Sequence, residues 1–253
     1  MKVYGLIGYP LNHSFSKKIF KEIFYKEHIK DVIYQEFPIK SIEKLPKLLE
    51  DYPDIYGLSV TAPYKETIIP FLCKLDDIAC RVGAVNSVKI FREHNKKLKL
   101  LGYNTDVFGF EKTLKPLLKP EHNKALILGT GGASKSIAFV LNKLGIDYTF
   151  VSRNPVNSEQ ISYKSIDKSA INSHYLIINA TPVGMFPNNN QYPDIPYQYI
   201  TNKHILYDLI YNPKETIFLK SGKLNGATTK NGLSMLYGQA EKSWEIWNKT
   251  LIP

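Results

Sequence analysis

LILGTGGAS, residues 126–134, joins a short apolar run directly to a glycine-rich turn. The apolar run is typical of a strand buried on both faces, and glycines without a Cβ let the backbone turn sharply and approach an anion closely. Beyond the turn, apolar side chains recur at helical spacing until Gly145, which predicts the end of a helix. A strand, a glycine turn and a helix in this order predict a dinucleotide-binding unit, with the pyrophosphate at the helix N-terminus.

A second strand, residues 148–151, completes this unit and is followed by Ser152, Arg153 and Asn154. NAD-binding proteins usually place an acidic residue here to hold the ribose 2′-hydroxyl. A guanidinium instead offers a 2′-phosphate paired donors and a full charge, so the sequence predicts NADP in preference to NAD. Two alternatives stay open, because Ser134 stands where a complete G-x-G-x-x-G pattern has its third glycine, and a lone loop arginine is often only a solvated charge.

The composition is that of an ordinary soluble protein, with 43% hydrophobic and 22% charged residues among 253. This length allows two modest domains with a sizeable core. The first ten residues, MKVYGLIGYP, contain too short an apolar run for a secretory signal, and no membrane-spanning run follows. We therefore expect a cytoplasmic protein that binds no membrane.

The formal net charge of +10 raises the question of nucleic-acid binding, which needs clustered cations. The lysines are spread along the chain, and no recognised binding motif accompanies them. We therefore expect no nucleic-acid partner and interpret the basic surface as an attraction for an anionic substrate and cofactor.

The two cysteines, Cys73 and Cys80, lie in sequence with a helical pattern. We expect them to be reduced core thiols, as is usual for an intracellular protein. No Cys and His cluster has metal-ligand spacing, so we expect no bound metal.

Strand and helix patterns alternate along the chain in two groups. The first group contains strands at 3–7, 32–37, 56–61, 84–91 and 97–103, with a hairpin tip at 92–99, and helices at about 16–28 and 41–50. The second group begins after Asp106 with a linking helix and contains, besides the glycine-turn unit, strands at 175–179 and 205–209. A last helix, from about 232 to 248, carries an apolar stripe that needs a partner surface.

These patterns predict a two-domain α/β protein. Residues 1–105 together with 233–253 are expected to form a substrate-binding and catalytic domain, to which the C-terminal helix returns. Residues 106–232 are expected to form a Rossmann-like NADP-binding domain.

Three polar clusters fall at strand ends in the first group, where a substrate would be held. They are Asn12, His13, Ser14 and Ser16; Ser59, Thr61 and Lys65; and Asn86, Asn104, Thr105 and Asp106. Taken singly, each residue also has a structural interpretation as a helix cap or turn residue, because caps and turns use the same residue types.

Eight ordered segments together resemble the shikimate dehydrogenase family over essentially the whole chain. They are GYPLNHSFS (8–16), GLSVTAPYKE (57–66), GAVNS (83–87), GYNTDVFGF (102–110), LGTGGASKS (128–136), NATPVGM (179–185), DLIYNP (208–213) and NGLSMLYGQA (231–240). Eight segments in family order are far more specific than any one of them.

The resemblance implies a reversible NADPH-dependent reduction of 3-dehydroshikimate to shikimate, within chorismate and aromatic amino-acid biosynthesis. It implies that Lys65 and Asp106 form the catalytic pair. The implied substrate contacts are Ser14 and Ser16 to the carboxylate, assisted by Tyr211, and Thr61, Asn86 and Gln239 to the hydroxyls. The implied cofactor contacts are Gly129, Gly131 and Gly132 at the pyrophosphate, Arg153 at the 2′-phosphate, Gly232 in the nicotinamide region, and Ala133, Ser152 and Thr181.

Some positions depart from the family pattern. Ser59 stands where Asn is common, so a contact with a substrate hydroxyl is in doubt or passes through water. Lys17 replaces a usual Pro, and Ser152 and Asn154 flank Arg153 where the family often reads Asn-Arg-Thr. None of these changes removes a catalytic group.

Alternatives to this function remain. One is a quinate/shikimate dehydrogenase of broader specificity that could also use NAD, against which Arg153 argues. Another is a non-catalytic NADP-binding regulator with the same fold, against which the retained Lys65 and Asp106 argue, because a sensor needs no proton donor. Either a monomer or a homodimer is compatible with the sequence.

Overall fold

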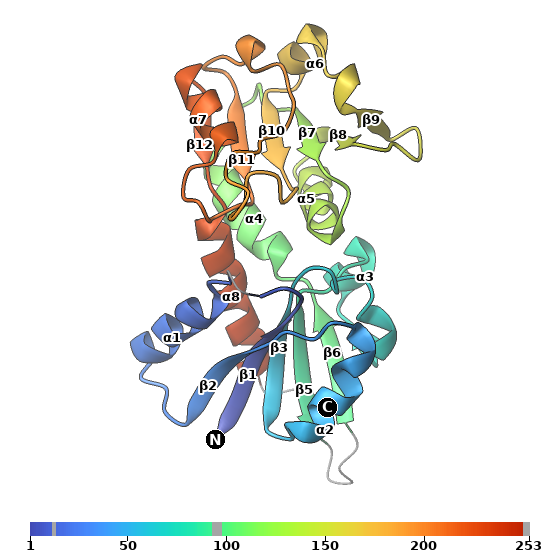
Figure 1. Ribbon diagram of the computed structural model, residues 1–253, viewed down its shortest axis with the longest axis vertical. Coiled ribbons are helices and arrows are strands. Elements are labelled where there is room, and N and C mark those ends of the chain that lie inside the picture. Colours follow the sequence, from blue (N-terminus) through green and yellow to red (C-terminus); the bar gives the residue numbers. More distant parts are fainter. Residues whose placement is uncertain (12–13, 93–97, 250–253) are drawn as a thin grey trace. The chain divides into compact units, whose positions relative to one another are not determined.

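The computed structural model describes residues 1–11, 14–92 and 98–249 (Figure 1). The chain divides into two compact units. The first comprises Met1–Gly109 and the segment from Leu236 to Pro253, and the second comprises Phe110–Met235. The divisions fall inside α4 (Asp106–Leu114) and α8 (Leu233–Asn248), so most of the C-terminal helix belongs to the first unit.

The first unit is built on a mixed sheet, whose strands are β1 (Lys2–Ile7), β2 (Val32–Phe37), β3 (Ile55–Val60), β4 (Lys74–Leu75), β5 (Ser87–Arg92) and β6 (Leu98–Tyr103). Within the described residues it has six strands in the order β2-β1-β3-β5-β6-β4. β1 pairs in parallel with β2 and β3, whereas β5 is antiparallel to β3 and β6. Its other elements are α1 (Ser16–Lys26), α2 (Leu45–Asp51), α3 (Asp77–Val82) and the 3₁₀ turns η1 (Ile42–Lys44) and η2 (Ile69–Phe71).

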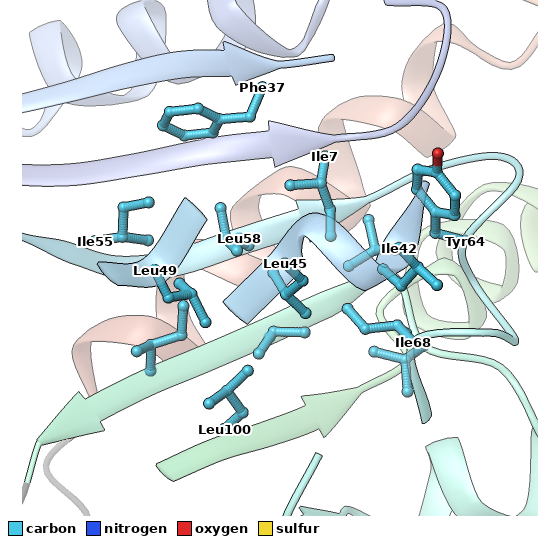
Figure 2. Close-up of a cluster of buried hydrophobic side chains, with 14 of the residues drawn as sticks. Ile7, Phe37, Ile42, Leu45, Leu49, Ile55, Leu58, Tyr64, Ile68 and Leu100 are labelled. Atoms are coloured by element: carbon cyan, nitrogen blue, oxygen red, sulfur yellow. The ribbon is translucent and has the colours of Figure 1, made fainter. Parts of the chain in front are cut away.

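Alternate residues of β1 face two different cores, as expected for a strand covered on both sides. Val3 and Ile7 belong to one hydrophobic cluster, and Tyr4 and Leu6 belong to the other. Figure 2 shows the first cluster, in which side chains of the sheet such as Ile7 meet residues of η1 and α2. Both layers are needed, because the apolar faces of a sheet must be removed from water.

Aromatic rings from α1, α8 and the sheet form the second cluster. Phe20 stacks on Tyr34 with ring centroids 4.1 Å apart and on Trp247 at 5.2 Å. Gly57 of β3 permits this packing, because a Cβ at this position would lie 2.6 Å from Trp247 Cδ2. The apolar stripe predicted on the last helix is thus buried against the first unit.

The second unit contains a wholly parallel sheet. Its strands are β7 (Lys124–Leu128), β8 (Asp147–Ser152), β9 (Gln160–Ser162), β10 (Leu176–Asn179), β11 (Ile205–Asp208) and β12 (Thr228–Lys230). Their order is β9-β8-β7-β10-β11-β12 among the residues described. This is the order of a doubly wound dinucleotide-binding sheet, whose direction of winding changes between β7 and β10.

Helices cover both faces of this sheet, which explains why β7, β10 and β11 are almost continuously buried. On one face, Phe110 of α4 contacts the ring of Tyr207 edge-on at 5.0 Å. On the other face, Phe218 of α7 joins a cluster that includes Leu126 and Ile177. The remaining elements are α5 (Gly132–Lys143), α6 (Lys168–Ser173), α7 (Ile217–Leu224), η3 (Lys115–Leu117), η4 (Tyr163–Ser165) and η5 (Tyr197–Tyr199).

Three sequence predictions need correction. Cys73 and Cys80 are free but exposed rather than core thiols, because the short helix α3 buries Ala79 and Val82 and turns Cys80 outward. The predicted helix at 41–50 begins as the 3₁₀ turn η1, and the predicted strand at 84–91 begins only at Ser87.

The predicted hairpin between β5 and β6 is described only in part. Residues 93–97, at the predicted hairpin tip, lie outside the described residues, although β5 and β6 do form an antiparallel pair. No helix in the described ranges combines the length and apolar character needed to cross a membrane.

Lys89 of β5 attaches the end of α8 to the first unit. The residue is only 7% exposed, and its ammonium donates to Ile246 O at 3.0 Å and to Lys249 O. The last carbonyls of a helix have no partner within the helix, and a cation there also interacts favourably with the helix dipole. A lysine inside the unit is thereby satisfied by the helix end.

Replacing Lys89 with Met should lower the free energy of unfolding by about 1–3 kcal/mol, since two carbonyls at the helix end would lose a charged donor. Urea unfolding followed by tryptophan fluorescence measures this, because both tryptophans lie on α8. Lys74→Met, at an exposed position on β4 of the same sheet, is the matched control and should change the value by less than about 0.5 kcal/mol. Equal effects of the two substitutions would show that the Lys89 contacts do not hold the helix.

Candidate active site

A largely buried ion pair joins two segments of the first unit. Lys65 lies in the turn region after β3, and Asp106 is the first residue of α4, where the helix dipole favours a carboxylate. Lys65 Nζ is 2.5 Å from Asp106 Oδ2, and the two side chains are 18% and 7% exposed. An ammonium has three N–H donors, so Lys65 can hold Asp106 and still offer a proton to an oxygen of a ligand.

The side-chain amide of Asn86 connects this pair to its surroundings. Its Nδ2 donates to Asp106 Oδ1 at 2.8 Å, and its Oδ1 accepts the backbone N–H of Thr105 at 2.6 Å. Nδ2 is also 3.2 Å from Gln239 Oε1 on α8. Asn86 is buried, so these contacts replace those it would make with water. Asn86 therefore gathers Lys65, Asp106 and Gln239 into one site of the first unit.

The hydroxyls of Thr105 and Ser243 and the side-chain amide of Asn104 make further contacts around this site. Thr105 Oγ1 is 3.1 Å from Ser243 Oγ and 3.4 Å from Gln239 Oε1. Asn104 Oδ1 accepts the N–H of Val107 at 3.2 Å, so Asn104 and not Asp106 caps α4. The carboxylate of Asp106 is thus left for Lys65 and Asn86.

The amino-terminal motif lies next to the strand that leads to Lys65. A Cβ on Gly8 would clash with Thr61 Cγ2. Only glycine therefore lets this segment approach Thr61 so closely. Ser14 Oγ accepts the backbone N–H of Ser16 at 3.2 Å, at the start of α1. Thr61 is partly exposed and Ser16 is buried. The neighbouring Asn12 and His13 lie outside the described residues.

Ser59, which departs from the family pattern, forms a buried hydrogen bond with Tyr34. Tyr34 OH donates to Ser59 Oγ at 2.8 Å, and both residues are buried. Burial raises the pKa of Tyr34, whose hydroxyl also hydrogen-bonds Ser16, so the phenol remains protonated. The short side chain of Ser59 therefore supports Tyr34 next to Ser16.

The glycine turn of the second unit follows β7, at the change of winding direction. Gly129 has φ +109°, and a Cβ there would lie 3.0 Å from Thr181 Cγ2, so the position requires glycine. A Cβ on Gly131, in contrast, would meet open space. Gly131 is the N-cap of α5 and has no side chain to bond the N–H groups of the first turn, which begins with Gly132 and Ala133. Unbonded N–H groups beside open space fit a pyrophosphate.

Arg153 directly follows β8, the strand beside β7. Its side chain is exposed and forms no ion pair with any residue in the described ranges. Ser152 Oγ accepts the N–H of Asn154 at 3.2 Å, which shapes the backbone around it. A guanidinium without a carboxylate partner remains available to a phosphate.

Thr181 and Gly232 are fixed by contacts at the ends of β10 and β11. Thr181 Oγ1 donates to Asn179 Oδ1 at 2.6 Å, and Asn179 Nδ2 donates to Asp208 Oδ1 at 3.1 Å. Gly232 lies against the backbone of Leu209, where a Cβ would clash with the carbonyl oxygen. Burial raises the pKa of Asp208 to about 7.

The residues implied by the family resemblance fall into two sets, one in each unit. The first unit holds Ser14, Ser16, Thr61, Lys65, Asn86, Asp106 and Gln239, and the second holds Gly129, Gly131, Gly132, Ala133, Ser152, Arg153, Thr181, Tyr211 and Gly232. Hydrogen bonds connect Lys65, Asp106, Asn86 and Gln239 directly. Tyr211 is the one implied substrate contact that belongs to the second unit.

Sequence reasoning missed several supporting residues. Ser243 lies four residues after Gln239 on one helix, a spacing that places both on the same face and so gave a usable signal. No local pattern in the sequence predicts the supporting contacts of Tyr34, Asn179 and Asp208. These contacts depend on which strands are neighbours in the sheet.

Comparison with known proteins identifies the family. The family model of the shikimate dehydrogenase substrate binding domain matches residues 6–88. A shikimate dehydrogenase (NADP(+)) of Methanococcus vannielii is 38% identical to this chain, over 96% of this chain and 90% of the relative.

Solved structures extend the likeness to the fold. The crystal structure of shikimate dehydrogenase 1 from Peptoclostridium difficile has a TM-score of 0.85 at 38% identity, covering 100% of this chain and 94% of that one. The shikimate 5-dehydrogenase of Thermus thermophilus, in complex with NADP(H) and shikimate, has a TM-score of 0.84 at 28% identity, covering 99% and 95%. Because the likeness in sequence and fold runs through nearly the full length of each protein, this chain belongs to the shikimate dehydrogenase family.

Proposed function

We propose that this protein catalyses the reversible NADPH-dependent reduction of 3-dehydroshikimate to shikimate, in the biosynthesis of chorismate and aromatic amino acids. The observation that carries the proposal is the ion pair of Lys65 and Asp106, held by Asn86 in the unit that includes the matched substrate-binding domain. A binding protein that only senses a nucleotide needs no proton donor there. The Thermus thermophilus relative, solved with NADP(H) and shikimate, supports the same two ligands for this chain.

NADPH, when bound, supplies the hydride that is added to the ring carbonyl carbon of the substrate. The carbonyl oxygen then carries negative charge, which Lys65 Nζ stabilises and neutralises by giving up a proton. Asp106 occupies one direction of the ammonium and so orients the other donors. In the oxidation of shikimate, the neutral amine of Lys65 accepts the hydroxyl proton.

The remaining polar residues of the first unit position the substrate. Ser14 and Ser16 offer hydroxyl donors to its carboxylate, and Thr61, Asn86 and Gln239 bind its hydroxyls. Asn86 and Gln239 suit this task because their amides are already held in a buried network and lose little freedom on binding. Tyr211 of the second unit is the additional contact to the carboxylate.

The second unit binds the dinucleotide. Gly129, Gly131, Gly132 and Ala133 surround the pyrophosphate at the start of α5, and Ser152 and Arg153 bind at the adenosine end. Thr181 and Gly232 complete the contacts. The fit is supported by the open space at Gly131 and by the exposed guanidinium of Arg153, which has no ion-pair partner in the part of the chain that the structure describes.

The protein is further proposed to act in the cytoplasm as a monomer or homodimer, without a nucleic-acid partner. Its excess of cations over anions serves the attraction of two anions, the substrate carboxylate and the cofactor phosphates.

A spectrophotometric assay tests the proposed reaction. Purified protein should oxidise NADPH when 3-dehydroshikimate is added and reduce NADP⁺ when shikimate is added. Parallel reactions with NADH and with quinate compare the specificity. Similar values of kcat/KM for quinate or NADH would establish the broader dehydrogenase, and tight NADP⁺ binding without turnover would establish a regulator.

Replacing Lys65 with Ala should reduce kcat by about a hundredfold or more, the usual scale for loss of a general acid. Lys65→Arg keeps the charge but supplies a group that does not release its proton at neutral pH, so its kcat should fall comparably while shikimate still binds. Lys74→Met, at an exposed position of the same unit, should retain full activity. A loss below about tenfold in a folded Lys65→Ala protein would exclude Lys65 as the acid.

Replacing Arg153 with Ala should raise the Kd for NADP⁺ by about 10- to 100-fold, the equivalent of one or two charge-assisted hydrogen bonds. The Kd for NAD⁺, which has no 2′-phosphate, should stay unchanged. Titration calorimetry gives both constants. Lys164→Ala removes an exposed cation of η4 and is the control. An unchanged NADP⁺ to NAD⁺ ratio in Arg153→Ala would refute the assignment.

A further inference from the structure

Asp208 is a fully buried carboxylate whose hydrogen bonds come from uncharged groups. Its Oδ1 accepts from Asn179 Nδ2 at 3.1 Å and from the backbone N–H of Ile210 at 3.0 Å. Its Oδ2 accepts from Thr216 Oγ1 at 2.6 Å. Asp208 forms no ion pair within the described residues, unlike Asp106 with Lys65.

A carboxylate in this position lowers the stability of the fold. Burial raises the pKa of Asp208 to about 7, whereas an Asp in an unfolded chain has a pKa of about 3.9. The folded state therefore binds the proton more tightly, so the contribution of Asp208 to stability falls as the pH rises from about 4 to about 7 and stays low above that. An asparagine of the same shape would avoid this penalty.

The charge strengthens an amide orientation that the backbone also favours, because Asn179 Nδ2 donates to Val183 O at 3.3 Å as well as to Asp208. An ionised carboxylate only accepts hydrogen bonds, so the NH₂ group of Asn179 must face Asp208 and the carbonyl oxygen must face away. That oxygen accepts from Thr181 Oγ1 at 2.6 Å and from the Thr181 backbone N–H at 3.1 Å. A protonated Asp208 or an asparagine there is uncharged and accepts hydrogen bonds more weakly, so the contacts that hold Asn179 and Ile210 would loosen.

The segments held in this way belong to the dinucleotide site. The side chain of Thr181 packs on Gly129, the first glycine of the turn, and Ala180 N donates to Leu128 O at 3.0 Å. On the other side, the Ile210 N–H is held by Asp208, and Ile210 O accepts the N–H of Gly232 at 3.0 Å. One carboxylate therefore fixes both Thr181 and Gly232.

We propose that Asp208 is a positioning residue for the dinucleotide, whose negative charge keeps Asn179 turned toward Thr181 and keeps Ile210 in place for Gly232. The inference rests on the proposed function, since it assigns no new ligand. The titratable group that faces Asp208 from a packed element is Tyr197 of η5, whose own pKa is raised by burial and then by the charge of Asp208. Asn179, Ile210 and Thr216 supply the remaining polar contacts and do not titrate in this range.

Calorimetric titration of NADP⁺ into wild type, Asp208→Asn and Tyr207→Phe tests the inference at pH 8 and pH 6. At pH 8, Asp208→Asn should weaken NADP⁺ binding about tenfold while its Tm equals or exceeds that of wild type. At pH 6 the difference should narrow, because the wild-type carboxyl is then protonated. The 2′-phosphate of NADP⁺ also titrates in this pH range, but it affects both proteins equally. The ratio of the Kd of Asp208→Asn to the Kd of wild type is therefore compared at each pH.

Tyr207→Phe is the matched control from the adjacent position of β11. It removes a buried hydroxyl that bonds Thr113 Oγ1 at 2.7 Å on the opposite face of the sheet, so it should lower Tm without changing the Kd. Equal NADP⁺ binding by Asp208→Asn and wild type, or a tenfold difference that persists at pH 6, would overturn the proposed role of Asp208. Neither outcome would affect the proposed function of the protein. Failure of wild type to bind NADP⁺ would overturn the proposed function itself.

A second variant covers the case in which Asp208→Asn does not fold. Thr216→Val removes one donor to the carboxylate, together with the N-cap acceptor of α7, and keeps Asn179 and the Ile210 N–H as donors to Asp208. A carboxylate with fewer donors protonates more readily, so the pH at which NADP⁺ binding weakens should move upward relative to wild type. An unmoved midpoint would contradict the inference, because a purely structural hydroxyl would change Tm only.

Discussion

The hydrogen bond from Asn86 Nδ2 to Asp106 Oδ1 is the contact on which the proposed catalytic site depends. Asp106 has two oxygens, and Asn86 occupies one while Lys65 occupies the other. The direction of the carboxylate is therefore set before any substrate binds, and the direction of the ammonium follows from it. Preorganisation of this kind matters for proton transfer, because the donor must already point at the oxygen on which charge develops.

Each unit contains a hydrogen bond between a buried side-chain amide and a buried carboxylate, but the surroundings of the two carboxylates differ. In each, a buried amide at a strand end donates to a carboxylate: Asn86 to Asp106, and Asn179 to Asp208. Asp106 is paired with Lys65, the proposed proton donor, which also compensates the buried charge. Asp208 is held by neutral donors alone, and its raised pKa is the physical consequence. The unit proposed to perform acid–base chemistry thus has a cation beside its buried carboxylate, whereas the buried carboxylate of the unit proposed to bind the dinucleotide has no cation partner among the described residues.

Sequence reasoning reached the parts of the protein that local chemistry determines. The glycine turn, the strand before it and the helix after it follow from local pattern, and β7 and α5 lie where expected. The exposure of Cys80 could not be inferred, because the inward face of a helix as short as α3 depends on what it packs against. The pairing of Asn179 with Asp208 needed the sheet order, since only the parallel register of β10 and β11 places these two strand-end residues opposite each other.

Ser134 shows why the incomplete glycine pattern does not argue against a nucleotide site. The first glycine is required by a positive φ and by the contact with Thr181, whereas the space beside the second glycine is open. The third position of the pattern serves close packing of the helix on the strand rather than contact with phosphate. Ser134 is fully buried there, and its hydroxyl has no partner among the described residues, so the helix accommodates a small side chain at the cost of one unsatisfied group. The departure therefore affects helix packing and leaves the phosphate-facing part of the turn intact.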